Sequence, residues 1–172
     1  LKRAERTVLS GFLNLRFENF DDKYYPKSGF DLNAEFSYAS NEATNLIENT
    51  TTPILLYNLK SAVSLGSDVT ILPSFYGRLL LNDNSATFRS NMLGGPEATQ
   101  LLNYQLPFVG LERTVIFKDK LFVGKLELRG RLTDDNYLSV IANIATDFNK
   151  FKDWRTREII GGYGLHYSYN SF

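Results

Sequence analysis

The sequence has no cysteine among its 172 residues, and it has a single histidine. Without cysteine, a disulfide framework and a thiolate metal site are both excluded. One histidine and scattered carboxylates give no metal-ligand spacing, so we expect neither a metal nor another cofactor. The 19 basic and 19 acidic residues cancel, so the chain lacks the basic surface of a nucleic-acid binder. No apolar run approaches the roughly 18 residues of a transmembrane helix, which leaves membrane-crossing strands open because their signal is weaker.

Aromatic residues are abundant, at 14% of the chain, and the dominant sequence period is two. Strict alternation of apolar and polar residues is the signature of β-strands with two different faces. Most of the alternating segments approach or exceed the roughly 9–11 residues with which a tilted strand spans a bilayer. We therefore predict an all-β fold, an antiparallel up-and-down meander of about seven strands that forms part of a transmembrane outer-membrane β-barrel. The alternating segments are 13–17, 32–38, 55–65, 69–81, 122–132, 138–144 and 159–169.

Short and long connections alternate along this meander. The short ones centre on 26–29, 66–68 and 134–136, and they contain the Pro, Gly, Asp and Asn residues that tight turns favour. The long ones are 40–52, 82–113, which reads as irregular, and 147–157. Short periplasmic turns at one end and long external loops at the other are the plan of an outer-membrane barrel.

The charged face of the strands is expected to avoid lipid. Lys125, Glu127, Arg129 and Arg131 alternate with apolar residues, and Arg or Lys at the bilayer midplane costs about 2–4 kcal/mol in such barrels. These four residues should line a wet lumen, with Leu and Phe facing outward. An alternative is a soluble, lipocalin-like lipid-binding barrel with its apolar face inside, but soluble strands are usually only about 5–6 residues long. Tyrosines near strand ends suit the aromatic girdles of a barrel: Tyr24, Tyr25, Tyr163, Tyr167 and Tyr169.

Three segments carry a family resemblance over roughly residues 12–172. Residues 21–30, with Tyr25, Pro26 and Gly29, resemble a periplasmic turn of the form acidic-x-x-aromatic-Pro-x-x-Gly. Gly94 and Gly95 stand where the family places a loop inserted into the lumen, and residues 162–171 resemble its third-last strand. The chain thus resembles the C-terminal half of a barrel from the bacterial surface-antigen superfamily. That superfamily includes outer-membrane assembly factors and two-partner secretion transporters.

Within that superfamily, residues 72–78 and 105–110 look like the barrel that follows a patatin-like phospholipase domain in Bacteroidetes-type proteins. The resemblance implies a bacterial outer-membrane location and a role in membrane anchoring or translocation. No Gly-x-Ser-x-Gly nucleophile elbow is present, so whether the protein is an enzyme stays open, and a phospholipase domain would lie before Leu1. An assembly or two-partner secretion barrel is the first alternative, and a small autonomous lipid A deacylase barrel is the next.

The chain departs from the superfamily in two places. Transporter members carry an Arg-Gly pair in the long loop, whereas Gly94 precedes Gly95 here. The family also continues with two more strands beyond the position of Phe172. We expect residues 1–172 to be a single barrel domain, an incomplete C-terminal portion without the closing strands. Since unpaired backbone is costly in hydrocarbon, missing strands of the same or a second chain are expected partners, together with outer-membrane lipid and lipopolysaccharide.

His166 and Ser168 are the one candidate catalytic pair. They lie two residues apart, on the same face of an expected strand, with Asn170 close behind. Lipid A 3-O-deacylases carry a similar His-x-Ser, in which histidine can act as a base toward serine. In those enzymes the pair faces lipid, whereas His166 shares the Gly and Ser face that we assign to the lumen. An ordinary polar pair is therefore the favoured interpretation.

Overall fold

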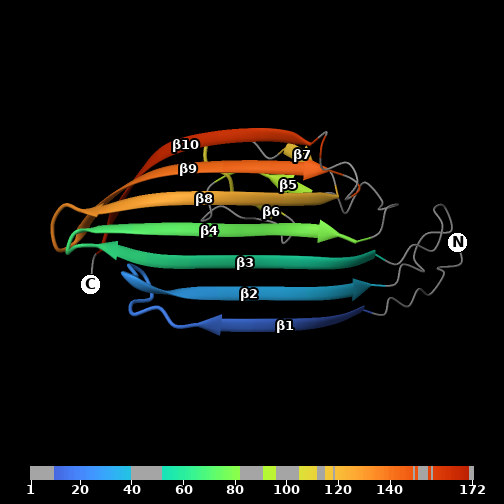
Figure 1. Ribbon diagram of the computed structural model, residues 1–172, viewed down its shortest axis with the longest axis horizontal. Helices are drawn as coiled ribbons and strands as arrows, with labels where there is room; N and C mark the ends of the chain where they lie inside the picture. Colours follow the sequence, from blue (N-terminus) through green and yellow to red (C-terminus); the bar gives the residue numbers. More distant parts are fainter. Residues whose placement is uncertain are drawn as a thin grey trace, which may run out of the picture.

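The computed structural model describes residues 10–39, 52–81, 91–95, 105–111, 115–117, 119–148, 150, 155 and 157–170. None of these residues forms a helix long and apolar enough to cross a membrane. Long strands run side by side along the long axis of the molecule (Figure 1). In chain order the strands are β1 (Ser10–Glu18), β2 (Ser28–Ala39), β3 (Thr52–Leu65), β4 (Val69–Leu80), β5 (Asn91–Leu93), β6 (Gln105–Leu106), β7 (Val115–Phe117), β8 (Lys120–Arg131), β9 (Asn136–Phe148) and β10 (Glu158–Tyr169).

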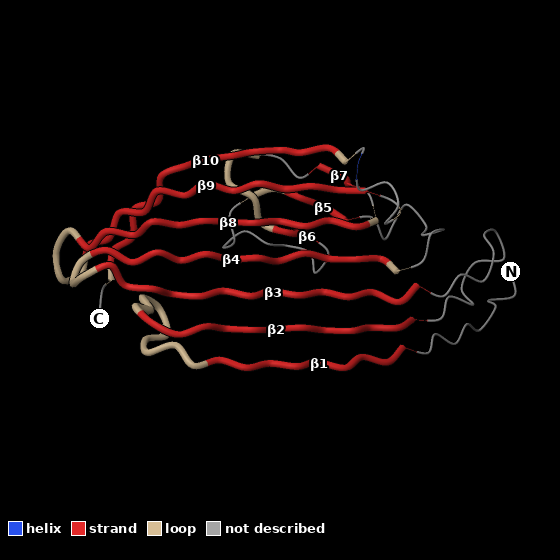
Figure 2. Tube along the Cα trace, viewed as in Figure 1, coloured by secondary structure: helices blue, strands red, loops and turns tan. Residues whose placement is uncertain are grey.

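Seven of the strands form one antiparallel sheet in the order β1-β2-β3-β4-β8-β9-β10. This sheet confirms the predicted all-β meander of about seven strands. The turns that join β1 to β2, β3 to β4 and β8 to β9 gather at one end, drawn in tan at the left of Figure 2. We call this the turn end, and the opposite end the loop end. Within the described residues β1 and β10 are the edge strands, so the sheet is not closed.

The register gives the sheet two different faces. Arg129 lies opposite both Thr70 and Ser139, and residues that face one another across antiparallel strands share a face. The face that carries Arg129 is called the inner face here, and the face that carries Leu126 is called the outer face. Leu126 is 51% exposed, whereas Arg129 is 7% exposed. Lys125, Glu127, Arg129 and Arg131 share the inner face, and the leucines that alternate with them lie on the outer face. That the inner face lines a lumen stays a prediction.

A second, small sheet lies against the inner face. Its order is β6-β5-β7, with β5 parallel to β6 and antiparallel to β7. Figure 1 shows it beside β8, β9 and β10. The prediction that 82–113 is irregular was wrong for β5 and β6. These short strands form by pairing with segments elsewhere in the chain, and local alternation gives no sign of such pairing. The buried core joins the two sheets and contains Tyr76, Leu93, Leu106, Phe108, Leu121, Val123 and Ala145.

A charge placed on the outer face should test which face meets lipid. We expect Leu126→Arg to lower the free energy of unfolding in phospholipid vesicles by about 2–4 kcal/mol, the cost of Arg at a bilayer midplane. Lys125→Arg, one residue away on the inner face, is the matched control and should change it by less than about 0.5 kcal/mol. Urea unfolding measures both. Equal tolerance of the two variants would contradict the assignment of the outer face to lipid.

Candidate functional site

The connection between β4 and β8 is held onto the inner face by a tyrosine. The Tyr76 hydroxyl, on β4, donates a hydrogen bond of 2.7 Å to the carbonyl of Pro107. Tyr76 belongs to the segment 72–78 and Pro107 to the segment 105–110, the two stretches that carry the resemblance to phospholipase barrels. The structure therefore brings together two motifs that are about 30 residues apart in the chain.

Asn143 on β9 makes the second attachment. Its Nδ2 donates to the Val109 carbonyl at 2.9 Å, and its Oδ1 accepts from the Val109 amide at 3.2 Å. One side-chain amide thereby satisfies both backbone groups of one residue, as a neighbouring strand would. Two glycines of β10 give Val109 its space. A Cβ at Gly162 would lie 2.1 Å from the Val109 carbonyl oxygen, and one at Gly164 would lie 2.5 Å from Val109 Cγ1.

Arg78 and Asn91 make the third attachment, and both are buried. Arg78 Nη1 donates to Asn91 Oδ1 at 2.8 Å, while Asn91 Nδ2 donates to the carbonyls of Arg78 and Asp119 at 3.0 Å each. Arg78, on β4 of the large sheet, thus fixes the start of β5. The connection between β4 and β8 lacks the Arg-Gly pair that transporter members carry. Sequence reasoning did not single out Tyr76, Asn91 or Asn143. Tyr76 and Asn143 lie on a polar strand face, where a polar residue carries no signal of its own, and Asn91 lies in the stretch that reads as irregular.

Gly94 and Gly95 lie within the connection between β4 and β8, whose described part contains β5, β6 and β7 and is called the attached segment here. Both have positive φ, at 136° and 76°, conformations that residues with a Cβ avoid. Their amides donate to the carbonyls of Leu106 and Leu111 at 3.0 Å each, and Gln105 Nε2 donates to the Gly94 carbonyl at 2.9 Å. The glycine pair therefore joins the end of β5 to β6 and to residues 108–111 through backbone hydrogen bonds. Both glycines lie on the inner-face side of the large sheet, while their position in a lumen stays a prediction.

The turn between β1 and β2 folds over the turn end of the same face. Tyr25 stacks on Tyr137 of β9, with ring centroids 4.1 Å apart and planes 13° from parallel. The Arg129 guanidinium lies 5.5 Å and 5.8 Å from the two ring centroids, and its Nη2 donates to the Pro26 carbonyl. The prediction that Tyr25 joins an outer aromatic girdle was wrong, because this cation–π contact and ring stack hold it on the inner face. Gly29, the second residue of β2, has a φ of 107°.

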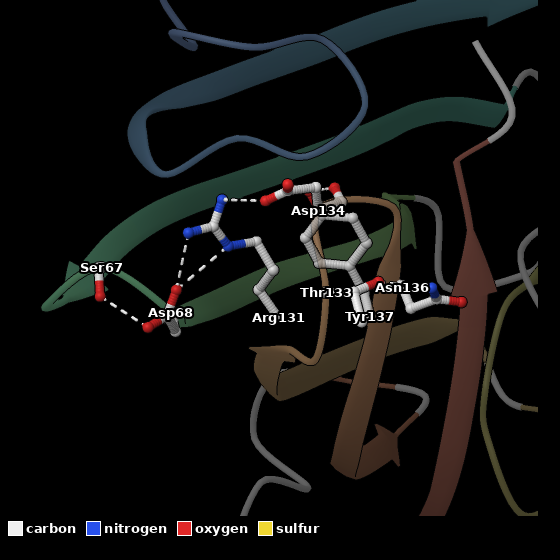
Figure 3. Close-up of polar contacts among 7 residues, drawn as sticks. All are labelled: Ser67, Asp68, Arg131, Thr133, Asp134, Asn136 and Tyr137. Carbon is white, nitrogen blue, oxygen red and sulfur yellow. Dashed lines mark hydrogen bonds and ion pairs between the residues drawn. The ribbon is translucent and has the colours of Figure 1, made fainter.

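Arg131 links the other two turns at this end, as Figure 3 shows. Its Nη2 and Nε donate to Asp68 Oδ1 at 2.8 Å and 3.1 Å, and its Nη1 lies 3.6 Å from Asp134 Oδ1. The Ser67 hydroxyl donates to Asp68 Oδ2 at 2.7 Å. The hydrogen bond from Ser67 and then the contact with Arg131 hold the pKa of the Asp68 carboxyl below its usual value.

The remaining predicted inner-face charges form a small polar group nearer the middle of the sheet. Lys125 Nζ lies 3.8 Å from Glu127 Oε2, and the Ser139 hydroxyl donates to Glu127 Oε1 at 2.8 Å. His166 and Ser168 lie on the inner face of β10, opposite Ser139 and Tyr137. In the described part of the chain no hydrogen bond joins their side chains, and their catalytic role stays a prediction. Among those same residues, no three potential metal ligands converge.

The large sheet thus has an apolar outer face and a partly polar inner face, and the small sheet and the β1–β2 turn cover parts of that inner face. The sequence profile of the OMP85 superfamily matches residues 4–172 of the chain. The chain belongs to the OMP85 superfamily. Members of this superfamily are outer-membrane barrel proteins, so the predicted location in the bacterial outer membrane is confirmed. The comparison with curated proteins found no match.

Filling the glycine space behind Val109 should release the attached segment. We expect Gly162→Ala to destabilise the protein by about 1–3 kcal/mol, the usual effect of an extra methyl group in a packed site. Hydrogen exchange at the Val109 amide should also become faster. Gly161→Ala is the matched control, because a Cβ there meets nothing within 4 Å, and it should change neither quantity. Unchanged exchange in Gly162→Ala would contradict this attachment.

The Asp68 contacts should make part of the stability depend on pH. A carboxyl whose pKa is lowered by folding stabilises the fold above its unfolded pKa, near 3.8, and loses this effect as pH falls through the lower folded value. Asp68→Asn should therefore unfold at lower urea than the wild type at neutral pH, and the difference should shrink well below pH 3.8. Asp135→Asn, in the adjoining turn, is the control. A difference independent of pH would exclude the charged contact as its cause.

Proposed function

We propose that this chain forms the wall of an outer-membrane barrel that anchors a patatin-like phospholipase-type protein. In this proposal the barrel also offers a route through the membrane, and the segment that contains β5, β6 and β7 occupies that route at rest. The observation that carries the proposal is the hydrogen bond between Tyr76 and Pro107, because it joins the two segments that resemble phospholipase barrels.

The covered half of the inner face supports a closed resting state. Leu93 and Asn91 of β5 and Leu121 and Val123 of β8 are all fully buried, so the attached segment excludes water from this half of the wall. Each side-chain hydrogen bond that holds it contributes about 0.5–1.5 kcal/mol. Release of the segment would break these hydrogen bonds and expose its buried apolar residues, so we propose that release requires the binding of a partner.

The middle of the inner face supports a wet interior. Lys125, Glu127 and His166 lie between the attached segment and the turn end, and all three have side chains at least partly exposed. Charges in such positions are tolerated where water reaches them and are costly in lipid. This division suits a barrel that is closed by its own connection and filled with water elsewhere.

An assembly or two-partner secretion barrel is the second candidate, and the superfamily match favours it as a class. The described edges of the sheet agree with either candidate. Both β1 and β10 have one side without a described strand partner, and backbone in hydrocarbon needs such a partner. We propose that further strands, from the same or a second chain, complete the barrel.

The native protein, extracted with detergent from its own outer membrane, separates the two candidates. We expect an intact mass several-fold above the 19.6 kDa of these 172 residues, and release of fatty acids from phospholipid vesicles. His166→Ala should leave that release unchanged, because the chemistry lies in another domain. Repeated periplasmic docking modules without lipase activity would favour assembly or secretion. A mass near 19.6 kDa with activity lost in His166→Ala would favour the autonomous deacylase.

A further inference from the structure

The outer face of the large sheet carries a groove that follows from its register. Phe75, Gly124, Ile144 and Gly161 lie side by side across β4, β8, β9 and β10. The next row toward the loop end has Gly77, Phe122, Thr146 and Ile159 in the same order. Large and small side chains thus alternate within each row, and the rows are offset. The result is a groove of about 200 Å³ lined by Phe75, Phe122, Gly124, Ile144, Ala145, Thr146, Arg157 and Ile159.

Gly124 forms part of the floor of the groove, and the space above it is open. A Cβ at this position would have one neighbour within 4 Å, Ile144 Cγ2 at 3.5 Å, which is an ordinary contact. Nothing in the backbone therefore demands glycine here, in contrast to Gly162. The missing side chain leaves unfilled space on a face that elsewhere carries leucine, valine and isoleucine.

The aromatic wall of the groove is held in place by its neighbours. Phe122 stacks on Phe148 with ring centroids 5.5 Å apart, and it lies 6.4 Å from Phe75. Tyr57 fills the space over Gly77, since a Cβ there would meet its ring and hydroxyl within 2.8 Å. Its ring lies 5.3 Å from that of Phe75. A wall fixed in this way exists before a ligand arrives, which lowers the entropic cost of binding.

Arg157 gives the groove a charged end. It immediately precedes β10, so it lies at the loop end, while Phe75 and Gly124 lie nearer the middle of the sheet. The groove is therefore apolar over most of its length and positively charged at its loop end, where the long connections begin. Arginine on the lipid side of a barrel is tolerated near the interface, where it costs about 0–1 kcal/mol, and its guanidinium matches a phosphate group.

We propose that this groove binds one acyl chain of a phosphorylated outer-leaflet lipid, with Arg157 at the lipid's phosphate. The proposal rests on the outer-membrane location and on the orientation in which the long connections face outward. Hydrocarbon is the medium around the outer face of such a barrel, so an acyl chain is the ligand available to fill an apolar groove there. Arg157, at the loop end, binds an anionic headgroup at the membrane surface on that side.

Native mass spectrometry of the detergent-purified full-length protein tests this binding with three probes: diphosphoryl lipid A, phosphatidylcholine and inorganic phosphate. We expect one lipid A to stay bound after other lipids are stripped, and phosphatidylcholine to bind more weakly. Arg157→Ala should weaken lipid A binding by about tenfold or more, the range for a charged hydrogen bond. Gly124→Leu, which fills the groove, should weaken both lipids.

Matched controls are available away from the groove. Arg155→Ala removes an exposed arginine that does not line the groove, and Gly11→Leu adds the same bulk on β1, where a Cβ meets nothing within 4 Å. Neither should change lipid binding. Equal binding of both lipids in wild type and Arg157→Ala would overturn the phosphate contact. Displacement of lipid A by inorganic phosphate, or full binding in Gly124→Leu, would overturn the acyl groove. None of these readouts uses phospholipase activity or transport, so failure here leaves the proposed function standing.

Discussion

The unbroken antiparallel register of seven strands is the constraint on which the rest of the structure depends. Because side chains alternate with a period of two, a slip of one residue between β8 and its neighbours would move Arg129 and its companions to the outer face. Hydrocarbon permits neither those charges nor unpaired backbone groups. The register therefore fixes in one step which residues meet lipid, where the attached segment can pack, and where the outer groove lies.

The inner face is divided along the strand direction. Toward the loop end it is apolar and covered, and Tyr76, Arg78 and Asn143 hold the connection through its backbone and through Asn91. Toward the turn end it is polar, and Arg129 holds the β1–β2 turn through Tyr25 and Pro26. Different residues therefore hold the connection between β4 and β8 and the β1–β2 turn.

Glycine has opposite meanings on the two faces of β8 and β10. Gly162 and Gly164 are required, because Val109 occupies the space where their side chains would be. On the outer face, Gly124 and Gly161 meet almost nothing, and their open space shapes the surface that lipid contacts. All four occur in strands of similar composition. The position of the attached segment distinguishes the two kinds. Gly162 and Gly164 leave space that Val109 of the same chain fills, whereas Gly124 and Gly161 leave space that is open to another molecule.

The sequence by itself determined the strands, the short turns and the separation of charged from apolar faces, because each depends on local alternation and turn chemistry. The family followed from the resemblance of three segments and from the match to the superfamily profile. The sequence did not determine the small sheet, the inward position of Tyr25 or the groove at Gly124. Those features arise from contacts between residues far apart in the chain, such as Pro26 and Arg129, which are 103 residues apart. A period of two assigns a side chain to a face but carries no information about what covers that face, and this is what the tertiary structure decided.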